Sequence, residues 1–270
     1  MEKSQRLPQL KHLSVVTAAI IMGYSLLPFV NVPVREISFS IFGILVAFKL
    51  RFTTLISIIT AGIAASGMDW MLRERGDLPM REILPHLMLP ALTAAAIGFP
   101  LGIIAVSLNW WVILGLGSLL VLLSLVGEII SFDSQHPLYP FAIILLTALS
   151  FSLVLITSIT IRAANLRLFL TVGILSAVYA FFGIRILQLR IGGVWPLKWT
   201  LVVGLVIGQI TIGLYYWPFT PIRFGLLLLA PAYALIGLAS SLEENLSFRE
   251  IYLEPLIVMG ILLVLAIFIG

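Results

Sequence analysis

The segment Gly127–Pro137, GEIISFDSQHP, places three side chains that can hold a proton or a cation within nine residues: Glu128, Asp133 and His136. It directly follows the apolar run LGLGSLLVLLSLV. A carboxylate beside so apolar a run is costly unless it is paired, hydrated or protonated. The pattern indicates either a helix-end carboxylate that reaches water or a polar pocket. In the pocket interpretation, Glu128 and His136 act as the acid–base groups.

The composition shows which solvent surrounds these groups. Of the 270 residues, 61% are hydrophobic and 10% are charged, whereas soluble domains average about 25% charged residues. Long apolar runs recur from Ser14 to the last residue, and they do not alternate as the strands of a membrane barrel do. The chain is therefore expected to be a multi-pass helical membrane protein.

Most of the apolar runs have 17–23 residues, close to the ~20 that cross the hydrocarbon core as a helix. They predict an all-α fold, a polytopic integral membrane helical bundle with nine or ten transmembrane helices. The run at 37–48 is short for a crossing, and we expect a tilted helix, a re-entrant element or the first half of one long helix to Met68. The predicted spans are 14–32, 36–49, 52–68, 84–107, 110–130, 138–160, 168–188, 196–217, 223–241 and 254–270.

No polar stretch is long enough for a separate domain, so residues 1–270 are expected to form a single transmembrane domain without an extramembrane domain. The longest polar stretch, 69–82, has charges of alternating sign. Asp69 and Arg73 are spaced i,i+4 and are expected to pair on a helical extension. We interpret the stretch as a connector at the membrane surface.

Acidic residues gather on one side of the membrane when successive loops are assigned to alternate sides. From residue 69 onward, one side receives the segments 69–82, 128–137, 185–198 and 242–254, which we call the charged face. It carries ten of the twelve carboxylates in the chain: Asp69, Glu74, Asp77, Glu82, Glu128, Asp133, Glu243, Glu244, Glu250 and Glu254. The other side carries arginines and, from residue 69 on, no acid.

The compartment that the charged face meets depends on the number of crossings. With ten crossings, Lys and Arg divide evenly and the positive-inside rule gives no answer. With nine, ten basic residues lie on the side of the charged face against four on the other, with Lys49 and Arg51 left within the chain. This count favours a cytoplasmic charged face. We expect the plasma (inner) membrane of a prokaryote.

Glu128 is expected to find its partner on the charged face, and the candidates are Arg185, Arg190, Arg81 and His86. Substrate-binding residues are predicted on the same face: Asp69, Arg73, Arg75, His86, Asp133, Arg185 and Arg190. Two histidines and two acids would suit zinc or iron if they converged. The sequence does not bring them together, so no metal and no cofactor is predicted.

Two functions remain open. The first is a permease-like carrier, or a subunit of a membrane complex, with a polar vestibule on the charged face in which Glu128 exchanges a proton. The alternative is an intramembrane enzyme acting on a lipid or lipid-linked substrate, whose head group the arginines would hold. The expected partners are membrane lipids and, in the subunit hypothesis, other membrane proteins. No nucleic-acid-binding module is recognisable in the sequence.

Overall fold

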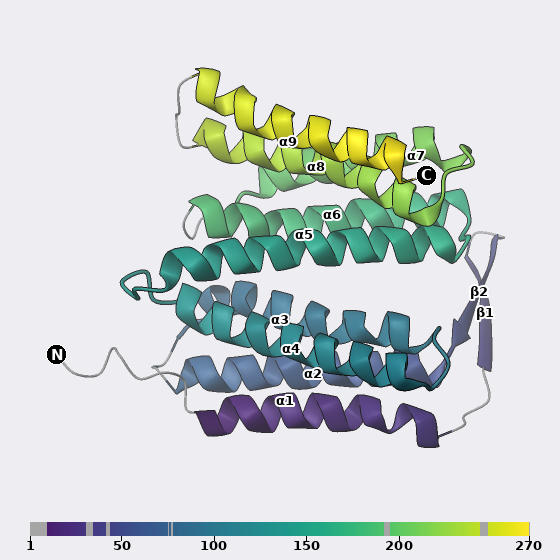
Figure 1. The fold of residues 1–270 in the computed structure, drawn as a ribbon, viewed down its shortest axis with the longest axis vertical. Helices are drawn as coiled ribbons and strands as arrows, with labels where there is room; N and C mark the ends of the chain where they lie inside the picture. Colours follow the sequence, from purple (N-terminus) through teal and green to yellow (C-terminus); the bar gives the residue numbers. More distant parts are fainter. Residues whose placement is uncertain are drawn as a thin grey trace. The chain divides into compact units, whose positions relative to one another are not determined.

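The computed structural model describes residues 10–30, 35–41, 44–74, 76, 78–191, 195–243 and 248–269. Within these residues the chain forms nine α-helices, one short 3-10 helix and one pair of strands (Figure 1). The elements are α1 (Leu10–Ser25), η1 (Leu27–Phe29), β1 (Arg35–Ile41), β2 (Ile44–Leu50), α2 (Phe52–Arg73), α3 (Met80–Leu101), α4 (Leu108–Ser131), α5 (Tyr139–Ala163), α6 (Leu168–Ile191), α7 (Leu197–Tyr215), α8 (Pro221–Glu243) and α9 (Phe248–Phe268).

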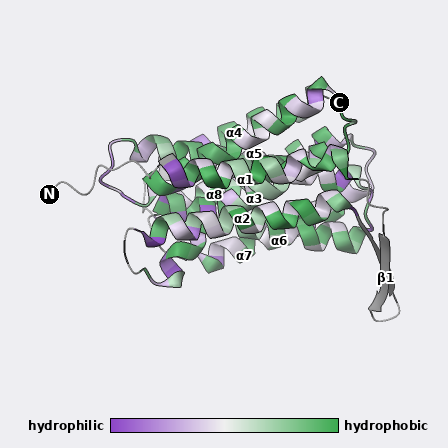
Figure 2. Cartoon of the chain, turned by 90° about the horizontal axis from the view of Figure 1, so that it is seen from below, coloured by the Kyte–Doolittle hydropathy of each residue, from purple (hydrophilic) through white to green (hydrophobic). Residues whose placement is uncertain are grey.

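The helices have the length and the composition of membrane spans. Eight stretches in the described residues are long and apolar enough to cross a membrane, from Lys11–Phe29 to Pro221–Glu243, and α9 contributes a shorter apolar stretch, Tyr252–Phe268. Hydrophobic residues cover most of each helix, and hydrophilic residues gather near the helix ends (Figure 2). The protein is therefore a multi-pass integral membrane protein, and the predicted helical bundle is confirmed.

The predicted span at 36–49 is wrong. Strands β1 and β2 pair there as an antiparallel hairpin, in a register that runs from Arg35 opposite Leu50 to Ile41 opposite Ile44. Ile37, Phe39 and Ile41 alternate with two serines, a period of two that favours a strand over a helix. The two helical alternatives for 37–48 are wrong as well, because the segment is a hairpin and α2 begins only at Phe52, whereas the re-entrant element stays a prediction. Without this span, nine helices remain in the described part.

The chain divides into two compact units, Met1–Ala142 and Ile143–Gly270. In the first unit, α2 packs against α1 and α3, and α4 packs against α3 and α1. A buried tyrosine joins three of these helices: the Tyr24 hydroxyl donates to the carbonyl oxygen of Ala94 at 2.7 Å and accepts from Thr60 at 3.1 Å. These contacts join α3 to α1 and α2, and α3 also packs against α4, the other helix that carries the candidate site.

In the second unit, α6 packs against α7 and α8, and α8 packs against α7 and α9. Two arginines bind carbonyl oxygens at helix C-termini, which lack intrahelical donors. Arg162 donates to the carbonyl oxygens of Tyr215 and Trp217 at 2.9 and 2.8 Å. Arg223 donates to those of Ala266 and Ile267 at 2.9 and 2.7 Å. These two guanidinium groups therefore hold the ends of α7 and α9.

Candidate functional site

Glu128 and His86 form a buried pair between two helices of the first unit. Glu128 lies three residues before the end of α4, and His86 lies six residues after the start of α3. The His86 Nδ1 atom is 2.7 Å from the Glu128 Oε2 atom. The Glu128 side chain is fully buried, and that of His86 is 14% exposed. The expectation that His86 is a partner of Glu128 is confirmed.

The surroundings of the pair are mostly apolar. The edge of the Phe132 ring meets the His86 ring at a centroid distance of 5.4 Å. Ile83, Leu125 and Ile129, from the same two helices, are buried to 1% exposure or less. The Ser131 hydroxyl donates to the Glu128 carbonyl oxygen at 3.0 Å and lies 3.4 Å from Oε2. In such a medium a charge-assisted hydrogen bond is stronger than in water, and each change of charge costs more.

Prolines interrupt α3 on both sides of the histidine. Pro85 and Pro90 lie inside the helix, and both are buried. Pro90 has no N–H to donate to the carbonyl oxygen of His86, the acceptor four residues earlier in a regular helix. Such breaks bend helices and are tolerated inside membranes where other groups satisfy the backbone. The His86 segment of α3 is therefore less regular than an uninterrupted helix.

A carboxyl and an imidazole at this distance can share one proton. The proton lies either on Glu128, next to a neutral imidazole, or on His86, next to a carboxylate, and the pair has the same net charge in both forms. Loss of that proton would make the net charge of the two side chains one unit more negative. Entry of a cation would restore the charge. The arrangement can therefore couple the loss of a proton to the arrival of a cation.

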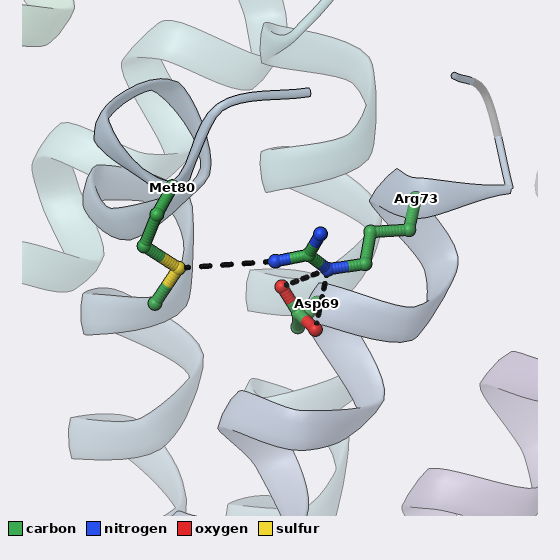
Figure 3. Close-up of polar contacts among 3 residues, drawn as sticks. All are labelled: Asp69, Arg73 and Met80. Atoms are coloured by element: carbon green, nitrogen blue, oxygen red, sulfur yellow. Dashed lines mark hydrogen bonds and ion pairs between the residues drawn. The ribbon is translucent and has the colours of Figure 1, made fainter. Parts of the chain in front are cut away.

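Asp69 and Arg73 form the surface pair that their spacing predicts. The Arg73 Nε atom donates to both carboxylate oxygens of Asp69, each at 2.9 Å, and Nη2 lies 4.0 Å from the Met80 sulfur (Figure 3). The two side chains are 31% and 45% exposed, and exposed ion pairs add little stability. Arg75, predicted to bind substrate with them, lies outside the described residues.

Asp133 and His136 make contacts within their own loop between α4 and α5. Asp133 Oδ1 accepts the N–H of Gln135 at 3.0 Å, and His136 Nδ1 accepts the N–H of Leu138 at 3.2 Å. Across the described ranges, no group of three or more His, Asp or Glu residues has the arrangement of a metal site. The structure thus brings His86 to Glu128, and it gives Asp133 and His136 the contacts of a turn.

Sequence reasoning missed a second histidine–glutamate contact in the first unit. His12 Nδ1 lies 3.2 Å from Glu74 Oε2, and the His12 ring lies 4.0 Å from the Trp70 ring. His12 is near the start of α1, and the other two are at the end of α2. Successive membrane spans usually pack antiparallel, which brings the start of α1 close to the end of α2. The sequence could have indicated the contact on this basis.

The two arginines predicted in the second unit differ in environment. Arg185 lies in α6 and is 4% exposed. Arg190, in the last turn of α6, is half-buried. Its Nη1 atom lies 3.4 Å from the Ser240 hydroxyl, and its guanidinium carbon lies 5.8 Å from the centre of the Tyr233 ring. Both belong to the charged face, and Arg190 is in contact with α8.

Comparison with known proteins identifies a family and no activity. Residues 32–269 match the model of a family described as "Protein of unknown function (DUF5656)". The chain belongs to this family. The match extends from before the hairpin to the end of α9 and leaves α1 outside. No curated protein and no solved structure matches the chain significantly.

Proposed function

We propose that this DUF5656 protein is a permease-like carrier that exchanges a proton for a cation at the Glu128–His86 pair. The observation that carries the proposal is a fully buried carboxyl group 2.7 Å from an imidazole, inside two membrane spans. Ionisable side chains within membrane spans are costly, and they characteristically serve ion pathways and proton relays. A solely structural contact between α3 and α4 would not need two titratable groups.

The distribution of charge supports this function. Glu128 lies about one turn from the end of α4 that leads to the charged face, where most of the carboxylates of the chain gather. The segment that leads from Glu128 out of the helix, 128–137, carries Asp133 and no Lys or Arg, so its local charge favours the approach of a cation. The pair is therefore placed where a cation from the aqueous side would reach it after crossing a short stretch of protein.

Nine crossings also favour one orientation. Lys49 and Arg51 precede α2 and so lie on the same side as Arg35. Ten basic residues then fall on the charged face with the N-terminal segment, and six on the other side, Arg35, Lys49, Arg51, Arg162, Arg167 and Arg223. The excess supports a cytoplasmic charged face. We propose the plasma membrane of a prokaryote, with its lipids and, in a complex, other membrane proteins as partners.

Proton flux into vesicles tests the function. The purified protein is reconstituted into vesicles that contain a pH-sensitive dye, and gradients of Na⁺, K⁺ or Mg²⁺ are imposed one at a time. At least one gradient is expected to change the pH of the lumen. Glu128→Gln is expected to reduce the change to that of protein-free vesicles, because an amide cannot release a proton. Glu82→Gln removes an exposed carboxylate from the same face and is expected to leave the flux unchanged.

Two results would contradict the carrier. One is the absence of flux above that of protein-free vesicles under all three gradients with the wild-type protein. The other is equal flux in wild-type and Glu128→Gln vesicles. The alternative, an enzyme acting on a lipid head group, predicts turnover of lipid by the protein in micelles and its loss in His136→Ala. The contacts of His136 within its own turn give that alternative no support.

A further inference from the structure

We propose that the second unit binds a zwitterionic phospholipid head group, with the phosphate at Arg190 and the ammonium group at Glu254. Three helices supply the site: Arg190 from α6, Tyr233 from α8 and Glu254 from α9. The two charged groups both contact Tyr233. This site lies outside the Glu128–His86 pair, and its test is independent of the carrier function.

Arg190 forms the part of the site that binds the phosphate. Its guanidinium group lies over the Tyr233 ring, 5.8 Å from the ring centre, and one nitrogen is 3.4 Å from the Ser240 hydroxyl. In the described part of the chain, both of these contacts are with neutral groups and do not neutralise the guanidinium charge. A guanidinium group binds phosphate oxygens through paired hydrogen bonds. Ser240 is buried, and its hydroxyl donates to the carbonyl oxygen of Gly237 at 2.9 Å, so its oxygen is held in place as an acceptor for the arginine.

Glu254 and two aromatic rings form the part of the site that binds the ammonium group. The Tyr233 hydroxyl donates to Glu254 Oε1 at 3.3 Å, and the Phe151 ring lies 5.1 Å from the Tyr233 ring. Glu254 is exposed and Tyr233 is half-buried. A carboxylate beside aromatic rings is the usual environment for an ammonium group. Among the described residues, no ion pair joins Arg190 to Glu254. The two opposite charges contact different parts of Tyr233: Arg190 lies over the ring, and Glu254 accepts from the hydroxyl group.

Close packing between α8 and α9 fixes this spacing. A Cβ atom added at Gly237 would lie 2.8 Å from the Pro255 ring, so a larger residue would push α9 away. Pro255 is buried and directly follows Glu254. The glycine therefore lets α9 approach α8 closely enough for Glu254 to reach the tyrosine hydroxyl.

The exposed surface of α9 favours a lipid over a water-soluble zwitterion. Apolar side chains continue along the helix from Glu254 and stay exposed: Leu253, Leu256, Ile257, Ile261, Val264 and Leu265. Within a membrane, such a surface contacts acyl chains. A phospholipid whose head group lies between Arg190 and Glu254 would have its acyl chains beside this surface. Phosphatidylethanolamine has the required phosphate and ammonium groups.

Lipid binding by the purified full-length protein in detergent tests the site. Native mass spectrometry would measure the retention of phosphatidylethanolamine, phosphatidylglycerol and soluble phosphoethanolamine. The wild-type protein is expected to prefer phosphatidylethanolamine to the other two. Arg190→Gln is expected to weaken this binding about tenfold, the loss of about 1.4 kcal/mol from one charge-assisted contact. Glu254→Gln is expected to remove the preference over phosphatidylglycerol, which has no ammonium group.

Matched variants separate binding from folding. Arg167→Gln removes an exposed arginine at the start of α6 and is expected to keep wild-type binding. Tyr233→Phe removes only the hydroxyl and is expected to weaken the preference for the ammonium group without loss of fold. Equal retention of phosphatidylethanolamine by Arg190→Gln and wild type would overturn the site. Equal wild-type binding of phosphatidylglycerol would do the same, and equal binding of soluble phosphoethanolamine would overturn the assignment to a lipid.

Discussion

At the scale of single residues, Glu128 depends on its neighbours for a tolerable environment. A fully buried carboxylate loses the water that would solvate it, and the imidazole of His86 at 2.7 Å replaces part of that solvation. Removing one partner of a buried pair typically costs more than the pair contributes, because it leaves the other partner in a medium that solvates it poorly. The pair should therefore be energetically coupled as well as close.

A double-mutant cycle measures that coupling. His86→Leu removes the imidazole and is expected to destabilise the protein by about 2–5 kcal/mol, because the acid then lacks one of its contacts. The double variant, which carries both His86→Leu and Glu128→Gln, should recover part of the loss. The coupling energy between the two positions is expected to be about 1–3 kcal/mol. The free energy of unfolding in mixed micelles is the quantity to compare. Strictly additive losses would show that the two side chains act independently.

The sequence identified Glu128 because it is a charge at the end of a long apolar run. It also indicated the face on which a partner should lie, but His86 was one of four candidates there. Whether His86 meets Glu128 depends on which side of α3 turns toward α4, and this follows from packing across the whole first unit. Asp133 and His136 stood out by proximity in sequence, although the helix ends at Ser131 and their side chains serve the turn that follows.

At the scale of elements, glycines decide how closely helices approach in the second unit. In α7, a Cβ atom added at Gly204 would lie 2.9 Å from the backbone oxygen of Ser176 and 3.0 Å from the Cβ atom of Ala180, both in α6. Gly213, in the same helix, has open space at the equivalent position. Small residues at helix contacts are the usual means of close packing in membranes.

Alanine substitutions at these two glycines should therefore have opposite effects. Gly204→Ala forces α7 away from α6 and is expected to lower the free energy of unfolding by about 1–3 kcal/mol. Gly213→Ala meets no neighbour and is expected to raise it by about 0.5–1 kcal/mol, since alanine favours the helix. Thermal unfolding of both variants in the same detergent compares them. Equal effects would contradict the close contact between α6 and α7.

Most helices could be predicted from length and hydropathy, because a span needs only enough apolar residues. The hairpin could not be found by this criterion. The residues of 37–48 are about as apolar as those of a span, and a strand is indicated only by the alternation of apolar residues and serines at 37–41. Two helix ends differ from the predicted spans. Helix α3 ends at Leu101, six residues before the predicted end at 107, and α2 continues beyond the predicted end at 68 to Arg73. Hydropathy does not mark where the backbone stops being helical.

At the scale of the whole molecule, the number of crossings determines the side on which each loop lies. The proposed nine crossings would put the segments after α2, α4, α6 and α8 on the same side as the N-terminus, and the hairpin on the other side. The charged face then holds eleven of the twelve carboxylates, the ten already named and Glu2, and Glu36 alone lies opposite. The proposed exchange of proton and cation depends on this asymmetry, because Glu128 lies about one turn from the end of α4 on that side.

Cysteine labelling in intact cells tests this arrangement most directly, and the chain has no cysteine of its own to interfere. Single cysteines would replace Ser134 and Leu242 on the charged face, and Ser107 and Ala164 on the other, all at exposed positions. A membrane-impermeant maleimide added outside is expected to label the Ser107 and Ala164 variants. The Ser134 and Leu242 variants are expected to react only after the cells are opened. Labelling of Ser134→Cys and Leu242→Cys from opposite sides of the membrane would contradict the account.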